Sequence, residues 1–402
     1  MSRRALTIEP PRDYLLPRDL CSYGYFLLAP NHFFPEDLTF RTTLDLSAAE
    51  ASYVPARSQA RAPAVTVLVR QGGAGKRGKF PKPGEVLEVR PDRALSKEQA
   101  RLVAAMLTRM LRLDEPGETV RAFHALDPRW GHEGAPEPLN PQLKPAIAGR
   151  GRLMRSASFF EDVVKTVTSC NVTWPSTVNM NAKLCRVVGA PSDSGLYAFP
   201  TPERLARTRP ATLRARCSVG YRDVRIVELA KLFARGRSQE RRSGVPEHPL
   251  ALLARAEAGE AQAQAQGKRA KRTRPEAPDR VHGAHFELPA ERGGFADEAM
   301  FEMLQEWPGI GPYAAANILQ LLGRYSRLPL DTESVRHAKS VLNMKGPAAK
   351  IMKRLHKHYD PFGEHKFRAY WFELWAFYES KRGPAWTWER ETTGKSFTAS
   401  QL

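Results

Sequence analysis

The tightest local constraint in the sequence is Pro-Gly-Ile-Gly at residues 308–311, which separates two stretches with helical periodicity. Residues 297–307 place apolar side chains on one helical face, and Pro308 ends this helix because proline interrupts a helix interior. The two glycines permit a very tight reversal of the chain. Residues 312–322 then repeat the helical pattern, starting with a proline that suits a first turn. The segment predicts two helices joined by a minimal hairpin.

The backbone of such a hairpin suits contact with a phosphate. Gly309, Ile310 and Gly311 would let another surface approach closely, and unpaired N–H groups at the start of the next helix attract anions. Because any pair of helices can use a turn of this kind, the hairpin alone leaves two interpretations open. It is either a DNA contact or an ordinary connection.

A single acidic residue follows the hairpin helices. Leu-Pro-Leu-Asp at residues 328–331 precedes a further helical pattern, so Asp331 is expected to cap that helix by accepting backbone N–H bonds. The helix dipole favours negative charge at this end. Capping would therefore leave Asp331 available as a fixed negative charge beside whatever binds at the hairpin.

Composition narrows the class of partner. The 402 residues carry a net charge of +19, which indicates a polyanion as the binding partner. Nucleic acid is the preferred candidate, and an acidic membrane surface is the alternative. No apolar run approaches the ~18 residues of a membrane span, and the start of the chain does not resemble a signal peptide. The four cysteines form no C-x-x-C pair and no His/Cys cluster, so we expect reduced thiols and no bound metal or iron–sulfur cluster.

The pattern along the chain predicts an α+β, mainly α protein. Four apolar or alternating segments indicate an antiparallel sheet, at residues 22–30, 38–46, 64–70 and 85–91. A helix is expected to start near Ser96, and helical patterns dominate the remainder. The expected organisation is a sheet-plus-helix domain at 1–115, a first helical part at 116–235, a mobile basic insertion at 236–290, a second helical part at 291–390 containing the hairpin and Asp331, and a tail at 391–402.

The hairpin and the Leu-Pro-Leu-Asp segment together resemble the helix-hairpin-helix DNA glycosylase superfamily, whose members cut damaged bases from DNA. Residues 152–185 resemble the family's early helical segment, in which Asn171 matches a side chain that fills the gap left by an extruded base. Residues 213–222 resemble its second insertion loop. There the resemblance makes Tyr221 a wedge and Arg222 the residue that faces the orphaned base.

The similarity covers roughly residues 150–235 and 295–380. The N-terminal strands match, by pattern only, the sheet domain of the alkylpurine and 8-oxoguanine branches. The resemblance implies duplex DNA with a damaged base as the partner, a monomer, and a place in the cytoplasm or nucleoid, or in the nucleus of a eukaryote. It implies no cofactor apart from a monovalent cation at the hairpin.

The implied chemistry is cleavage of an N-glycosidic bond through an oxocarbenium-like transition state, which a carboxylate such as Asp331 can stabilise. Bifunctional members of the family carry a lysine two residues after the second hairpin glycine, where this chain has Tyr313. Lys165 and Lys339 lie nearest to the matched motifs, but neither fits the pattern. The sequence therefore predicts a monofunctional enzyme that uses water.

Aromatic residues suggest which base is removed. Trp371 and Trp375 in the last helix, Trp174 beside Asn171, and Tyr313 could offer electron-rich faces to a cationic base. Packing in the core is the competing interpretation for the tryptophans. An alkylated purine is the favoured substrate, and an 8-oxoguanine or mismatch-type glycosylase is the alternative.

Two readings from other classes remain open. One is a non-catalytic DNA-binding protein that keeps the hairpin for phosphate contact, and the other is a membrane-surface or RNA-binding protein that relies on charge alone. The second of these leaves the spacing between the hairpin and Asp331 unexplained.

Overall fold

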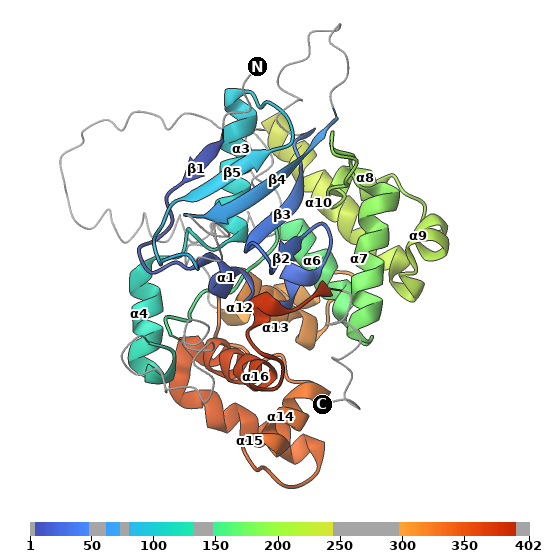
Figure 1. Cartoon of the computed structure of the whole chain (residues 1–402). Helices are drawn as coiled ribbons and strands as arrows, with labels where there is room; N and C mark the ends of the chain where they lie inside the picture. The colour runs from blue at the N-terminus through green and yellow to red at the C-terminus, as the bar shows by residue number, and fades with distance from the viewer. Residues whose placement is uncertain (1–4, 48–61, 73–79, 132–147, 244–296, 391–402) are drawn as a thin grey trace, which may run out of the picture.

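The computed structural model describes residues 5–47, 62–72, 80–131, 148–243 and 297–390 (Figure 1). A small antiparallel sheet is followed by helices, which confirms the predicted α+β, mainly α fold class. The predicted 391–402 tail and most of the predicted 236–290 insertion lie outside the described residues.

The sheet has five antiparallel strands in the order β1-β5-β4-β3-β2. Three of the predicted strands are confirmed, and two short edge strands were not predicted. Their bounds are Leu6–Ile8 for β1, His32–Phe34 for β2, Thr39–Asp45 for β3, Ala64–Gln71 for β4 and Leu87–Pro91 for β5. The central pair of strands, β3 and β4, carries the longest register, from Phe40 opposite Val69 to Asp45 opposite Ala64.

The strand predicted at residues 22–30 is wrong. The structure forms the 3₁₀ helix η1 over Gly24–Leu27, and the bond between Ala29 and Pro30 is cis. Almost every residue of this segment is buried, so its apolar run reflects burial on all sides rather than one face of a sheet. It also contains no β-branched residue, and its strand-favouring side chains are aromatic ones that are buried in the core: Tyr23, Tyr25 and Phe26.

Serine side chains cap two helices in the first two-thirds of the chain, one of them the helix predicted to start near Ser96. Ser96 caps α3 in a capping box with Gln99, and Ser158 accepts a hydrogen bond from the Glu161 N–H at the start of α6. The bounds are Leu16–Leu20 for α1, Lys97–Met110 for α3, Gly117–Leu126 for α4, Phe159–Ser169 for α6, Trp174–Val188 for α7, Pro202–Ala206 for α8, Pro210–Cys217 for α9 and Asp223–Ser243 for α10. Helix α10 thus continues past residue 235, where the insertion was predicted to begin.

Two hydrophobic cores organise the helices of the C-terminal part: α12 (Asp297–Gln305), α13 (Pro312–Leu321), α14 (Thr332–Ser340), α15 (Ala348–Tyr359) and α16 (Lys366–Arg382). One core joins the sheet and α3 with α14, α15 and α16. The other joins α6, α7, α9 and α10 with α12 and most of α13. In Figure 1, α12 and α13 lie between the helices on the right and those at the bottom.

Buried arginines tie the two cores together. Arg112 donates to the carbonyls of Gln320 and Leu321 at 2.8 and 3.0 Å, and Arg155 donates to that of Leu321 at 3.4 Å; both arginines are buried. A cation at the C-terminal end of α13 complements the helix dipole and satisfies carbonyls that the helix leaves unpaired. These contacts fix α13, whose other end faces the candidate site.

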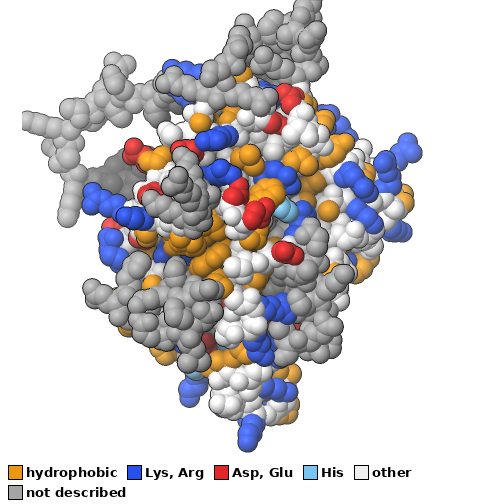
Figure 2. Space-filling view, in the orientation of Figure 1, with side chains coloured by type: hydrophobic (Ala, Val, Ile, Leu, Met, Phe, Trp, Pro, Cys, Tyr) orange, Lys and Arg blue, Asp and Glu red, His pale blue; other side chains and the backbone are white. Residues whose placement is uncertain are grey.

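The surface agrees with the excess of positive charge. Figure 2 shows Lys and Arg side chains spread over the visible face, including the lower end, where α15 lies in Figure 1. No helix in the described part of the chain has the length and apolar character needed to cross a membrane.

Candidate active site

The predicted hairpin is present between α12 and α13. Gly309 has a φ of +78°, and the Ile310 N–H donates to the Trp307 carbonyl at 3.1 Å to close the turn. A Cβ at position 309 would lie 2.7 Å from Cδ of Arg225, so the lack of space also favours glycine here. Gly309 and Gly311 are exposed, whereas the Ile310 side chain is buried in the core. At the predicted DNA contact, Ile310 would therefore offer its backbone and not its side chain.

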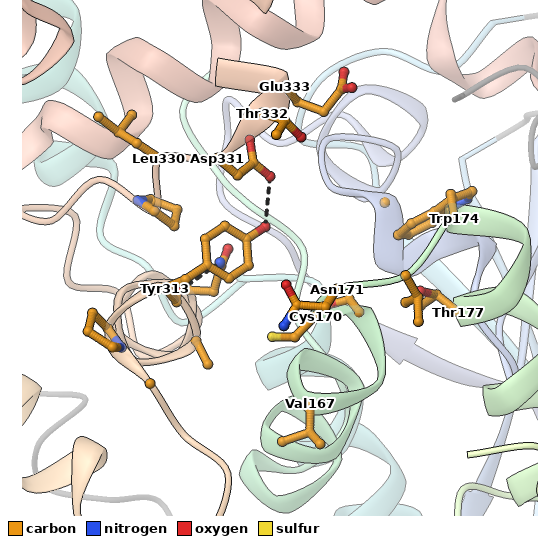
Figure 3. Close-up of a pocket in the computed structure, with 18 of the residues that line it drawn as sticks. Val167, Cys170, Asn171, Trp174, Thr177, Tyr313, Leu330, Asp331, Thr332 and Glu333 are labelled. Atoms are coloured by element: carbon orange, nitrogen blue, oxygen red, sulfur yellow. Dashed lines mark hydrogen bonds between the residues drawn. The ribbon is translucent and has the colours of Figure 1, made fainter. Parts of the chain in front are cut away.

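A pocket of about 1150 Å³ opens beside the hairpin (Figure 3). Every site residue named from the sequence lines this one pocket, although the residues come from α7, α13, α16, the start of α14, the hairpin, the 3₁₀ turn Gly220–Arg222 and the loop between α6 and α7. The structure therefore brings the predicted site together. The role assigned to each residue remains a prediction.

Asp331 lies at the N-terminus of α14 and at the wall of the pocket. Its Oδ1 accepts hydrogen bonds from the Ser334 N–H at 3.0 Å and the Ser334 hydroxyl at 3.1 Å, which makes it the N-cap of this helix. Its Oδ2 accepts a hydrogen bond from the Tyr313 hydroxyl at 3.2 Å, the contact drawn in Figure 3. One carboxylate oxygen is thus committed to the fold, and the other faces the pocket side.

Tyr313 occupies the position at which bifunctional glycosylases would carry lysine. Burial raises its pKa well above the ordinary value for tyrosine, and the charge of Asp331 raises it further. The hydroxyl therefore keeps its proton and acts as a hydrogen-bond donor to Asp331. The pocket geometry assigns Tyr313 a contact with the carboxylate, in addition to the aromatic surface predicted for it.

Lysine is not found among the described residues that line the pocket. Lys165 is fully buried, with Nζ 2.6 Å from Glu161 and 5.4 Å from the centre of the Tyr25 ring. Lys339 is exposed on α14 but does not line the pocket. Neither of the two lysines considered in the sequence is therefore placed to attack a sugar in this pocket.

Asn171 is exposed at the mouth of the pocket, in the loop between α6 and α7, with a φ of +52°. Arg222 lies directly beneath this loop and donates to the carbonyls of Val167 and Cys170, with a longer contact to that of Asn171. Only 5% of Arg222 is exposed. Its guanidinium thus supports the loop that carries Asn171, and little of it is exposed to an orphaned base.

Tyr221 projects from the neighbouring loop and is 55% exposed, which suits the predicted wedge. Two arginines hold its ring, with the guanidinium carbons of Arg222 and Arg225 at 4.4 and 5.2 Å from the ring centre. The Arg225 stem also packs against Gly309 of the hairpin. Arg225, which was not predicted, therefore connects the candidate wedge with the hairpin.

The tryptophans of α16 line the pocket but use their ring faces on other aromatic side chains. Trp371 stacks on Phe367 with a 9° angle between rings and on Trp375 with an angle of 26°. Their indole N–H groups donate to the carbonyls of Ser22 and Cys21 at 2.8 and 3.1 Å. This arrangement favours the core-packing interpretation over base stacking for Trp371 and Trp375.

The remaining aromatic surface comes from two places. Trp174, at the first position of α7, is partly exposed, and one side of its indole packs on Gly24, where a Cβ would lie 2.7 Å away. Tyr23 precedes that glycine and also lines the pocket. The N-terminal segment, which the sequence analysis did not connect to the site, therefore forms one wall of it.

The pocket also contains residues that no sequence signal identified. Glu333 follows Asp331 on α14, and its Oε2 accepts hydrogen bonds from the Tyr378 hydroxyl at 3.0 Å and from Arg336. Asn317 lies one turn after Tyr313 on α13, so its helical spacing from a named residue could have indicated it. No group of three or more His, Cys, Asp or Glu side chains suited to a metal occurs among the described residues. The monovalent cation predicted at the hairpin remains a prediction.

Comparison with known proteins identifies the fold. No protein-family model matches the sequence, and no curated protein matches it. Among solved structures, 3-methyladenine DNA-glycosylase from Archaeoglobus fulgidus is 16% identical, with a TM-score of 0.54 over 94% of this chain and 99% of that one. MBOgg1 in complex with low affinity DNA ligand is also 16% identical, with a TM-score of 0.55 over 95% of this chain and 100% of that one.

These similarities establish a shared fold rather than a shared activity, because the identities are low. The chain has the fold of the helix-hairpin-helix DNA glycosylases, and the resemblance predicted from the sequence is confirmed at that level.

Proposed function

We propose that the protein is a DNA glycosylase that extrudes a damaged nucleotide from duplex DNA and hydrolyses its N-glycosidic bond. The observation that carries the proposal is the place of Asp331, which lines a pocket between the hairpin and an exposed wedge candidate, with one oxygen held by Ser334 and the other by Tyr313. The name of the Archaeoglobus neighbour and the DNA ligand of MBOgg1 support the same class of partner.

Asp331 would act on the sugar. As the bond between C1′ and the base nitrogen breaks, its electron pair leaves with the base and positive charge develops on the ring. A fixed carboxylate stabilises that charge without needing to reorient, since Ser334 and Tyr313 already hold both of its oxygens. Water then adds to C1′ and releases a proton, leaving an abasic site in an intact strand.

The proposed enzyme is monofunctional. A strand-cleaving glycosylase needs an amine to form a Schiff base with the sugar, and the described lining offers tyrosine in place of lysine at the relevant position of α13. The phenol of Tyr313 keeps its proton, so it does not replace the amine as a nucleophile.

An alkylated purine is the substrate that this chemistry favours. Alkylation at a ring nitrogen makes the base cationic, so it leaves as a neutral molecule and needs no proton from the enzyme. Histidine, the commonest general acid, is not among the described residues that line the pocket. Trp174 and Tyr23 provide aromatic surface that attracts such a cation. In this proposal the protein acts as a monomer on the DNA of the nucleoid, or of the nucleus in a eukaryote.

An excision screen tests the function. Duplexes each carry one lesion: 3-methyladenine, hypoxanthine, 8-oxoguanine, uracil or a T·G mismatch. We expect release of the alkylated base and strand breaks only after alkali. Breaks without alkali would contradict the monofunctional assignment. Tight binding to every duplex without release of any base would show a DNA-binding protein in place of an enzyme.

A further inference from the structure

One polar side chain in the wall of the pocket has no role in the mechanism above. Asn317 lies on α13, one turn after Tyr313, and only 7% of it is exposed. It nevertheless lines the pocket, so the little surface that it offers faces a potential ligand. Its partner across the wall is the hydroxyl of Tyr23, which lies 3.4 Å from Oδ1 of Asn317.

The direction of the Asn317 amide is fixed by its own helix. Nδ2 donates to the Tyr313 carbonyl at 3.1 Å, whereas the reversed amide would place two oxygens against each other at that distance. Oδ1 is therefore the end that meets Tyr23. An amide oxygen has two acceptor positions, and the Tyr23 hydroxyl uses one of them.

Tyr23 holds this arrangement in place. Its ring lies 4.8 Å from the rings of both Tyr25 and Trp371, and burial raises its pKa above the ordinary value, so the hydroxyl remains a neutral donor. Trp371 is fixed in turn by its hydrogen bond to the Ser22 carbonyl. The amide oxygen is thus presented by a rigid wall, with one acceptor position left.

An acceptor in a largely dehydrated wall discriminates between bases. When a ligand displaces water from the pocket, Oδ1 must find a donor on the ligand or lose a hydrogen bond, and a buried acceptor without a donor is costly. Sites built in this way reject analogues that lack the matching N–H group far more strongly than apolar pockets reject extra bulk.

We propose that Asn317 accepts a hydrogen bond from the exocyclic amino group of the extruded base, and that the substrates are alkylated aminopurines derived from adenine or guanine. This assignment rests on the proposed glycosylase function and narrows its substrate class. Asn317 contacts the base, whereas Tyr23 is a positioning residue that keeps Oδ1 directed into the pocket.

Matched pairs of lesions test the assignment. One pair is 7-methylguanine and 7-methylhypoxanthine, and the other is 3-methyladenine and 3-methylpurine; the members of each pair differ only by the exocyclic amino group. The single-turnover rate constant for base release is measured for both members with the wild-type protein and with Asn317→Leu and Tyr23→Phe. The readout is the ratio within a pair divided by the same ratio for spontaneous release without protein, because a general loss of folding or catalysis affects both members equally.

For at least one pair, we expect the wild-type ratio to favour the amino-bearing base by at least about tenfold. Asn317→Leu has nearly the same shape but no acceptor, and its ratio should fall to about one. Tyr23→Phe leaves Oδ1 without its positioning contact and should show an intermediate ratio.

A wild-type ratio near one in both pairs, or a preference that survives in Asn317→Leu, would overturn the assignment and leave the glycosylase proposal standing. If the wild-type protein releases neither member of either pair but does release another lesion, the aminopurine class is wrong. Release of no base from any duplex would instead refute the proposed function, and this assignment with it.

Discussion

Replacing Asp331 with asparagine separates the two roles that the structure gives to this residue. Asparagine caps a helix about as well as aspartate, so Asp331→Asn should keep the hydrogen bond from the Ser334 N–H and change the free energy of unfolding by less than about 0.5 kcal/mol. Asp331→Ala removes the cap as well and should lower that free energy by about 1 kcal/mol.

The effect on excision should be much larger and shared by both variants. A carboxylate about 4 Å from a unit positive charge stabilises it by about 4 kcal/mol at an effective dielectric constant of about 20, which corresponds to roughly a thousandfold in rate. The assay is single-turnover release of the base found in the screen, with urea unfolding and duplex binding measured on the same preparations. If Asp331→Asn retains excision within tenfold of the wild-type rate, the assignment of Asp331 as the charge that stabilises the sugar is wrong.

Three further predictions concern the surroundings of the site. Gly309→Ala should lower both stability and DNA binding more than Gly195→Ala, because both positions have φ near +78° but only position 309 would contact Arg225; urea unfolding and duplex titration compare the two. Arg222→Met should lower the free energy of unfolding by about 3 kcal/mol, since buried carbonyls lose a charged donor, and equal stability would show that water replaces it. Burial lowers the pKa of His337, so the unfolded chain binds more protons and stability should fall as pH drops below about 6.5; His337→Phe should reduce that slope, and an unchanged slope would assign it to other groups.

Local signals in the sequence predicted the local features of the site. Asp331 caps its helix and α3 starts beside Ser96, because an N-cap depends on residues three positions apart. The hairpin followed from two prolines and two glycines within five residues. In each case the physical cause lies inside the segment, so the prediction did not depend on the rest of the fold.

Contacts between distant segments could not be predicted in this way. Tyr23 and Asn317 are 294 positions apart, and only the packing of the N-terminal segment against α13 and α16 brings them together. Trp371 and Trp375 line the pocket, but the sequence did not show that they stack on each other. Arg222 was expected to face DNA, whereas the fold uses its guanidinium beneath the Asn171 loop.

The central claim is that water replaces a base at C1′ and leaves the strand whole. Mass spectrometry of the lesion-bearing strand after a single-turnover reaction tests this directly. We expect a full-length strand that has lost the base and gained one hydroxyl group. A strand of unchanged mass, or one cut at the lesion before any alkali is added, would contradict it.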